Sequence, residues 1–138
     1  MAKVSITSGL YKLGAAHKYA QCLAHYLQND TPYWCFGSHG GFEKNYDAMA
    51  ANIRKIHVKL DGEKPWPTSF SRSERTCNNY LVYTQHLYFH EHFQIIGLIY
   101  PNNAHEMADI LLPGLIVLAE EFIECDKSHL DKLKTYDA

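Results

Sequence analysis

Three strand-like segments follow one another in the middle of this chain, and they limit the folds it can adopt. Residues 53–60 alternate apolar and polar side chains, and residues 80–88 and 93–100 are rich in β-favouring residues. Only a short polar turn separates the last two segments, which is typical of an antiparallel meander. Residues 15–28 carry apolar side chains at three- and four-residue intervals, which predicts a helix that packs on the sheet.

The remaining segments extend this pattern in both directions. Alternation over residues 4–7 predicts a short strand, and the glycines of residues 33–45 predict a loop. Prolines stop the helix near residues 31–32 and end the sheet near residues 101–103. We expect short helices at 46–52 and 104–111, an interruption at Pro113, and a last helix from 114 to about 133.

These elements predict one α+β domain over residues 1–138. Its N-terminal helices and C-terminal helix pack on a mainly antiparallel sheet of about four strands, and the tail at about 127–138 is expected to fray. The chain has 138 residues, of which 46% are hydrophobic, enough for one folded core. The net charge of −2 excludes a globally basic protein, so any anion binding must come from a local patch.

The cysteines and the apolar segments indicate a cytoplasmic protein. Cys22, Cys35, Cys77 and Cys125 are widely spaced and form no CxxC pair, so we expect free thiols in a reducing compartment, with a disulfide framework as the alternative. No run approaches the roughly 18 apolar residues of a membrane span, and the N-terminus lacks the apolar core of a signal peptide.

Basic side chains gather on one strand and on the loop that follows it. Lys55, His57 and Lys59 alternate along residues 53–60, and the loop carries Arg72 and Arg75. Arginine binds phosphate through two parallel hydrogen bonds, and RNA cleavage needs a base, an acid and a cation for the charged transition state. Candidates for these roles are His57, Lys59, Arg72, Tyr83 and His86. The alternative is an outer strand face that is merely solvated.

Three other features each allow two interpretations. Trp66 and Phe70 in the same loop could stack on unpaired bases, or a Trp-Pro plug could close the end of the sheet. The glycines around His39 could form a phosphate cradle or a plain connector, and they lack the spacing of a P-loop. The histidines around the polar turn between residues 80–88 and 93–100 could bind zinc or be exposed polar residues. They are His86, His90 and His92, with His105 later in the chain.

The order of several short motifs resembles the YafO family of toxins from type II toxin–antitoxin pairs. The motifs are CFGSHGGF, IRKIHVKL, PWP, FSRSE, YLVYTQ and IIGLIYP, followed by an amphipathic C-terminal helix. The resemblance extends from about Phe36 to Phe122. It implies a RelE-like fold and an mRNA interferase that cuts mRNA in the ribosomal A site without a metal or other cofactor. It also implies a cognate antitoxin that covers the basic face.

The residues and the resemblance together give an expected site. The positions that match the family pattern are Arg54, His57, Ser71, Arg72 and Tyr83. We expect His57, Arg72, Tyr83 and Lys59 to be catalytic, and Arg54, Lys55, Ser71, Arg75 and His86 to bind RNA. We expect no metal site, no DNA binding by the chain alone and no membrane association. The acidic net charge motivates an alternative, a non-catalytic binding module that acts through a partner protein.

Overall fold

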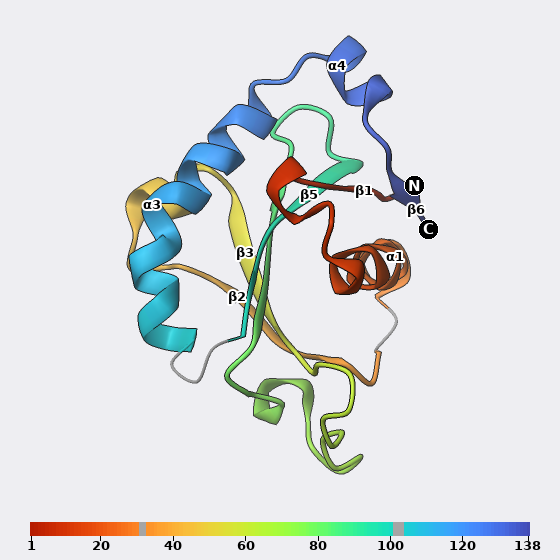
Figure 1. The fold of residues 1–138 in the computed structure, drawn as a ribbon, viewed down its shortest axis with the longest axis vertical. Helices are drawn as coiled ribbons and strands as arrows, with labels where there is room; N and C mark the ends of the chain where they lie inside the picture. The colour runs from red at the N-terminus through yellow and green to blue at the C-terminus, as the bar shows by residue number, and fades with distance from the viewer. Residues whose placement is uncertain (31–32, 101–103) are drawn as a thin grey trace.

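A mixed β-sheet forms the centre of the molecule (Figure 1). The computed structural model describes residues 1–30, 33–100 and 104–138, and the side chains of 104–110 are outside this description. The described residues form a six-stranded sheet in the order β2-β3-β4-β5-β1-β6. Neighbouring strands are antiparallel except β1 and β5, which are parallel. The strands are β1 (Lys3–Ile6), β2 (Phe36–Gly41), β3 (Ile53–Val58), β4 (Tyr80–Gln85), β5 (His92–Ile99) and β6 (Tyr136–Asp137).

Helices cover both faces of the sheet. Helix α1 (Gly14–Asn29) lies on one face, and α2 (Tyr46–Ala50) and α3 (Ala104–Ile123) lie on the other (Figure 1). Helix α4 (Lys127–Lys132) follows α3, and the two termini meet where β6 pairs with β1. Within the described part of the chain, no helix is both long and apolar enough to cross a bilayer. The α+β class predicted from the sequence is confirmed.

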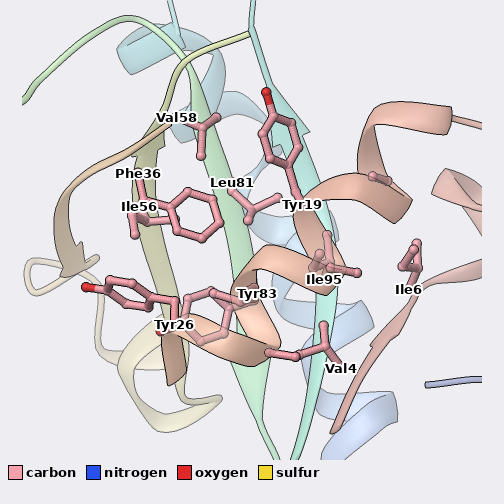
Figure 2. Packing of buried hydrophobic residues seen from close by; sticks show 14 of the residues in the cluster. Val4, Ile6, Tyr19, Tyr26, Phe36, Ile56, Val58, Leu81, Tyr83 and Ile95 are labelled. Atoms are coloured by element: carbon pink, nitrogen blue, oxygen red, sulfur yellow. The ribbon is translucent and has the colours of Figure 1, made fainter. Parts of the chain in front are cut away.

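The two faces of the sheet form separate cores. The α1 side buries Tyr19, Leu23 and Tyr26 of the helix against residues of β1 to β5. Figure 2 shows Tyr19 and Tyr26 among the strand residues of this core. The α3 side buries Leu112, Leu115 and Ala119 against β4 and β5. Strand β4 contributes to both, since Leu81 and Tyr83 face α1 while Tyr80 and Val82 face α3. Successive side chains of a strand point to opposite faces, so a strand covered on both sides is apolar throughout.

The sheet is larger than the predicted four strands. Residues 36–41 were expected to lie in a loop because of their glycines, but they form edge strand β2, paired with β3. Pairing with a neighbouring strand supplies the backbone hydrogen bonds, and this outweighs the low strand propensity of glycine. The other added strand is β6, in the tail expected to fray. There the Ala138 N–H donates to the Ala2 carbonyl at 3.2 Å.

The C-terminal helices also differ from the expectation. Pro113 does not separate two helices but lies inside α3. An interior proline removes one backbone hydrogen bond, and the packing of Leu112 and Leu115 on the sheet outweighs this loss. The long helix expected to reach about residue 133 ends at Ile123. Asp126 then caps α4, because its carboxylate accepts the His129 N–H at 2.8 Å. The expected breaks at 31–32 and 101–103 lie outside the described residues.

The first prediction concerns α4. Leu130 is fully buried, so Leu130→Ala should lower the free energy of unfolding by about 2–5 kcal/mol through lost packing and a cavity. Leu111→Ala is the matched control, because Leu111 is 42% exposed and its loss should cost less than about 0.5 kcal/mol. Urea unfolding followed by circular dichroism measures both. Equal small losses would show that α4 does not pack stably on the domain.

Candidate functional site

Strand pairing brings three polar side chains to the α1 face near the edge of the sheet. Arg54 of β3 lies directly opposite Gly41 of β2 and Tyr83 of β4. His39 of β2 lies opposite Ile56. Directly paired residues of neighbouring strands share a face, and Ile56 and Tyr83 belong to the α1 core. His39, Arg54 and Tyr83 therefore share the face that α1 covers.

A hydrogen bond between the side chains of Tyr83 and His39 crosses strand β3. The Tyr83 hydroxyl lies 2.6 Å from Nε2 of His39, and the ring centroids are 5.7 Å apart. Tyr83 is only 2% exposed, whereas His39 lies on the exposed edge strand and reaches solvent. The buried phenol therefore holds one nitrogen of an exposed imidazole in place.

The loop of residues 59–79 returns across the edge of β2. The Ser38 N–H donates to the Arg75 carbonyl at 2.8 Å, and the Trp66 indole donates to the Thr76 carbonyl at 3.0 Å. The approach to Gly37 is very close: a Cβ there would lie 2.2 Å from the Arg75 oxygen and 2.9 Å from the Trp66 ring. Only a glycine allows the loop to pass this strand, and the loop carries Arg72.

Arg72 reaches the same face from this loop. Its guanidinium lies over the ring of Tyr26, 5.3 Å from the ring centroid, and Nη1 is 3.1 Å from an Asp30 carboxylate oxygen. Asp30 ends α1 in the left-handed conformation. The Tyr26 ring also contacts His39 at a centroid distance of 6.0 Å, and Tyr26 and Tyr83 lie beside each other in Figure 2. These residues form one group, the His39 cluster, which consists of Tyr26, His39, Arg54, Arg72 and Tyr83.

Positive charge dominates the electrostatics of the His39 cluster. The pKa of His39 lies below its ordinary value, because the ring is partly desolvated and because Arg54 and Arg72 disfavour a further positive charge. Burial raises the pKa of Tyr83, and nearby Arg54 partly opposes this effect. At neutral pH the cluster thus holds a neutral imidazole, two neutral phenols and two arginines. It combines a proton acceptor with two anion-binding groups.

The structure separates the predicted site residues into two groups. Arg54, Arg72 and Tyr83 belong to the His39 cluster. Lys55 and His57 instead point to the α3 face, where Lys55 lies over the rings of Phe42 and Tyr80 at 4.6 and 5.1 Å. Lys55 and His57 thus share one face of β3, as their alternation predicted, but Arg54 is separated from them, because neighbouring residues on a strand point in opposite directions.

His57 and Lys59 contact the long loop. Nδ1 of His57 lies 3.0 Å from the Cys77 backbone nitrogen, and its ring packs on Tyr80. The ammonium of Lys59 lies 4.8 Å from the centroid of the Trp66 ring. The Trp66 indole donates to the Thr76 carbonyl, and its ring lies beside Gly37 and the Lys59 ammonium. These contacts agree with the interpretation that the Trp-Pro segment is a plug at the end of the sheet.

Ser71, Arg75 and His86 have local partners. Ser71 precedes the short 3₁₀ helix η2 (Arg72–Glu74), and its hydroxyl and N–H both donate to the Glu74 carboxylate. Arg75 donates to the Phe70 carbonyl at 3.3 Å. His86 is only 1% exposed, and its Nδ1 accepts the backbone N–H groups of Tyr88 and Phe89. A side chain so deeply buried offers no surface to RNA, and His86 is not part of the His39 cluster.

The described residues contain no group of three or more histidine, cysteine, aspartate or glutamate side chains that could hold a metal ion. His86, His90 and His92 therefore do not converge on a ligand set within the part of the chain described, and the side chain of His105 lies outside it. His92 is 2% exposed, and the exposed His90 makes a local contact with the Leu87 carbonyl at 2.7 Å.

Sequence reasoning missed His39 and Tyr26 as functional candidates. His39 lies among glycines that predicted a loop, and Tyr26 appeared only as one more residue of a helix. The available signal for His39 was its place inside CFGSHGGF, one of the motifs that resemble the YafO toxins. No signal marked Tyr26, because its role depends on the loop that brings Arg72 over its ring.

The fold and the His39 cluster define a small α+β protein with an arginine-flanked histidine, and the comparisons agree with the family indicated by the motifs. A family model described as Toxin YafO, type II toxin-antitoxin system, matches residues 24–124. This range covers most of the chain and all of the His39 cluster, and the chain belongs to the YafO toxin family. Membership implies a cognate antitoxin as partner. No curated protein and no solved structure matches the chain.

The second prediction tests the passage of the loop across β2. Gly37→Ala should lower the free energy of unfolding by about 1–3 kcal/mol, because the added methyl collides with the Arg75 carbonyl and the Trp66 ring. Gly40→Ala is the control on the same strand, because its Cβ meets only a Glu43 oxygen at 3.7 Å. Thermal unfolding of the two variants measures the difference in their stability. Two equally stable variants would show that the loop does not hold this close contact.

The third prediction concerns the pKa of His39. Arg54→Gln should raise it toward the ordinary value of about 6.5, because a nearby positive charge is removed. Lys55→Gln removes the same charge from the next residue, which points to the other face, and should change the pKa of His39 much less. Titration of the imidazole signals by NMR measures both variants. Equal shifts would place Arg54 outside the cluster.

Proposed function

We propose that this YafO-family toxin is an mRNA interferase, an endoribonuclease that cuts mRNA on the ribosome, and that the His39 cluster is its active site. One observation carries the proposal: an exposed imidazole is hydrogen-bonded to a buried phenol and is flanked by two arginines. This arrangement suits the attack of a ribose 2′-hydroxyl on the adjacent phosphate, which needs a proton acceptor and cations close together.

His39 acts as the general base in this proposal. The Nε2–H tautomer donates to the Tyr83 oxygen and leaves the lone pair of Nδ1 to accept the 2′-hydroxyl proton. Tyr83 is a positioning residue, since it fixes the ring orientation and the tautomer. The lowered pKa keeps the His39 ring unprotonated at pH 7, so that it can accept a proton. The new P–O2′ bond displaces the 5′-oxygen, which takes its proton from solvent.

Arg54 and Arg72 stabilise the negative charge that develops on the phosphate oxygens. Arg72 is occupied by Asp30, but this pair is exposed, with 41% and 82% of the two side chains accessible. Exposed ion pairs contribute only about 0–1 kcal/mol, so a phosphate with two charged oxygens can replace Asp30 at little cost. The Tyr26 ring packs against the guanidinium whether Arg72 binds Asp30 or a phosphate.

The proposal includes the partners of the reaction. The substrate is mRNA in the ribosome, the site of action is the cytoplasm, and the RelE-like character of the fold is part of the same proposal. The net charge of −2 fits a protein that relies on the ribosome to hold the RNA and supplies only a local cationic cluster. The cognate antitoxin would neutralise the toxin by covering this cluster.

The fourth prediction tests the catalytic assignment. In a purified translation system, His39→Ala should slow mRNA cleavage by about 10²- to 10⁴-fold, the usual contribution of a general base. Tyr83→Phe should slow it less, because the base remains but its orientation is lost. Cleavage is measured by primer extension on a translated message, and induction in cells without the antitoxin measures growth arrest.

His90→Ala is the matched control, since it removes an exposed histidine outside the cluster. It should cleave like the unmodified protein. If His39→Ala keeps full cleavage while Arg72→Ala and His57→Ala reduce it, the base assignment is wrong. If the unmodified protein arrests growth but leaves ribosome-bound mRNA intact, a non-catalytic toxin acting by binding replaces the nuclease.

A further inference from the structure

A groove on the far side of the sheet from the His39 cluster takes no part in the proposed reaction. It encloses about 630 Å³ between β1, the last turns of α3, and α4 (Figure 1). The alternate residues Val4 and Ile6 of β1 belong to the α1 core. Ser5 and Thr7 therefore point to the opposite face, where they line the groove. Its apolar lining comes from Leu118, Phe122 and Leu133. Sites that bind ligands in proteins commonly have a volume of this size.

The floor of the groove carries a buried hydroxyl without a partner. Thr7 precedes the short 3₁₀ helix η1 (Ser8–Leu10), at a position where a threonine hydroxyl commonly accepts a backbone N–H. The Thr7 side chain makes no such hydrogen bond, and none to another described residue, although Thr7 is only 9% exposed. The neighbouring Ser5 hydroxyl is satisfied, since it accepts the Gln94 amide at 3.1 Å. Buried polar groups rarely stay unpaired, so the Thr7 hydroxyl points to a ligand that supplies the missing hydrogen bond.

The rim of the groove is acidic. Glu121 lines the groove and also a shallower hollow of about 290 Å³ beside it, which Glu124 and Asp126 line as well. The Asp126 carboxylate caps α4, whereas Glu121 and Glu124 are exposed and form no ion pair with a described residue. Lys134 also lines the groove, and its ammonium lies 6.0 Å from the centroid of the Tyr11 ring. A partner that presents a cationic side chain beside an apolar one complements this surface.

Family membership supplies a protein partner for the groove. A toxin of a type II pair has a cognate antitoxin, and apolar walls with a charged rim are typical of surfaces that bind a protein segment. The family model matches residues 24–124, so the parts of the groove that come from β1 and α4 lie outside it. Membership therefore does not assign the groove. A contact there would let the antitoxin distinguish this toxin from other members of the family.

We propose that a segment of the cognate antitoxin docks in this groove. An apolar side chain of the segment packs among Leu118, Phe122 and Leu133. A polar group of the segment bonds the Thr7 hydroxyl, and a lysine or arginine faces Glu121.

The groove and the His39 cluster lie on opposite faces of the sheet, so docking leaves the cluster free for a second segment of the same antitoxin. Binding of one segment raises the local concentration of the other, so the whole antitoxin binds more tightly than either segment alone. Docking in the groove rests on family membership. Only the covering of the cluster by the second segment rests on the proposed function.

The fifth prediction tests the groove by filling it. Ser8 is exposed and lines the groove, so Ser8→Trp should weaken antitoxin binding by about tenfold or more, because the indole blocks the entry of the segment. Ser128→Trp is the matched control and should bind normally, because Ser128 is exposed on α4 but does not line the groove. The full chain is purified with the antitoxin encoded beside the toxin gene, freed from it in urea and refolded. Isothermal titration with that antitoxin then measures the Kd.

A charge reversal tests the rim independently. Glu121→Lys should weaken antitoxin binding by about tenfold, because an ammonium replaces the carboxylate that faces the cation of the partner, and the effect should shrink at high salt. Glu120→Lys is the control, because Glu120 is also exposed but lines a separate hollow with Asp47. Glu121 is exposed, so this variant still decides the proposal if circular dichroism shows that Ser8→Trp does not fold.

The outcomes separate this inference from the proposed function. Ser8→Trp should cleave mRNA like the unmodified chain, and more antitoxin should be needed to stop it. If the unmodified chain cleaves no mRNA, the nuclease proposal fails, and the antitoxin affinities still decide the groove. If Ser8→Trp and Glu121→Lys bind the antitoxin as tightly as their controls, the antitoxin does not occupy the groove. If the chain forms dimers that Ser8→Trp disrupts while antitoxin affinity is unchanged, a second copy of the chain is the occupant instead.

Discussion

The alternation of side chains along β3 and β4 is the constraint on which the rest of the structure depends. Both strands lie inside a sheet that helices cover on each face. Successive residues along each strand therefore belong alternately to the α1 core and to the α3 core. This alternation directs Arg54 and Tyr83 toward α1, and Lys55 and His57 toward α3. Residues that are neighbours in the sequence thus take part in different surroundings, and the cationic cluster forms on one face only.

The second requirement is the return of the long loop across β2. Gly37 gives the loop room to pass, the Arg75 carbonyl pairs with the edge of the strand, and Arg72 then reaches Tyr26. The edge strand, the helix and the loop each contribute one part of the cluster.

Much of the fold followed from local patterns. The period-two alternation and the apolar helix predicted the meander of β3, β4 and β5 and the position of α1, because these signals depend on burial of one face. The patterns failed for β2, where glycines suggested a loop, and for Pro113, which suggested a break in α3. In both places packing and strand pairing in three dimensions outweighed the local preference.

For the site, the sequence by itself determined which chemical groups are present: the arginines, Tyr83 and a set of motifs that place the chain among the YafO toxins. Only the tertiary structure decided which of them meet. His39 belongs to the cluster because β2 pairs with β3, whereas the expected residue His86 lies outside it with a buried side chain. The physical reason is that contacts between distant segments depend on strand register and loop path, and a one-residue change of register would turn each side chain to the other face.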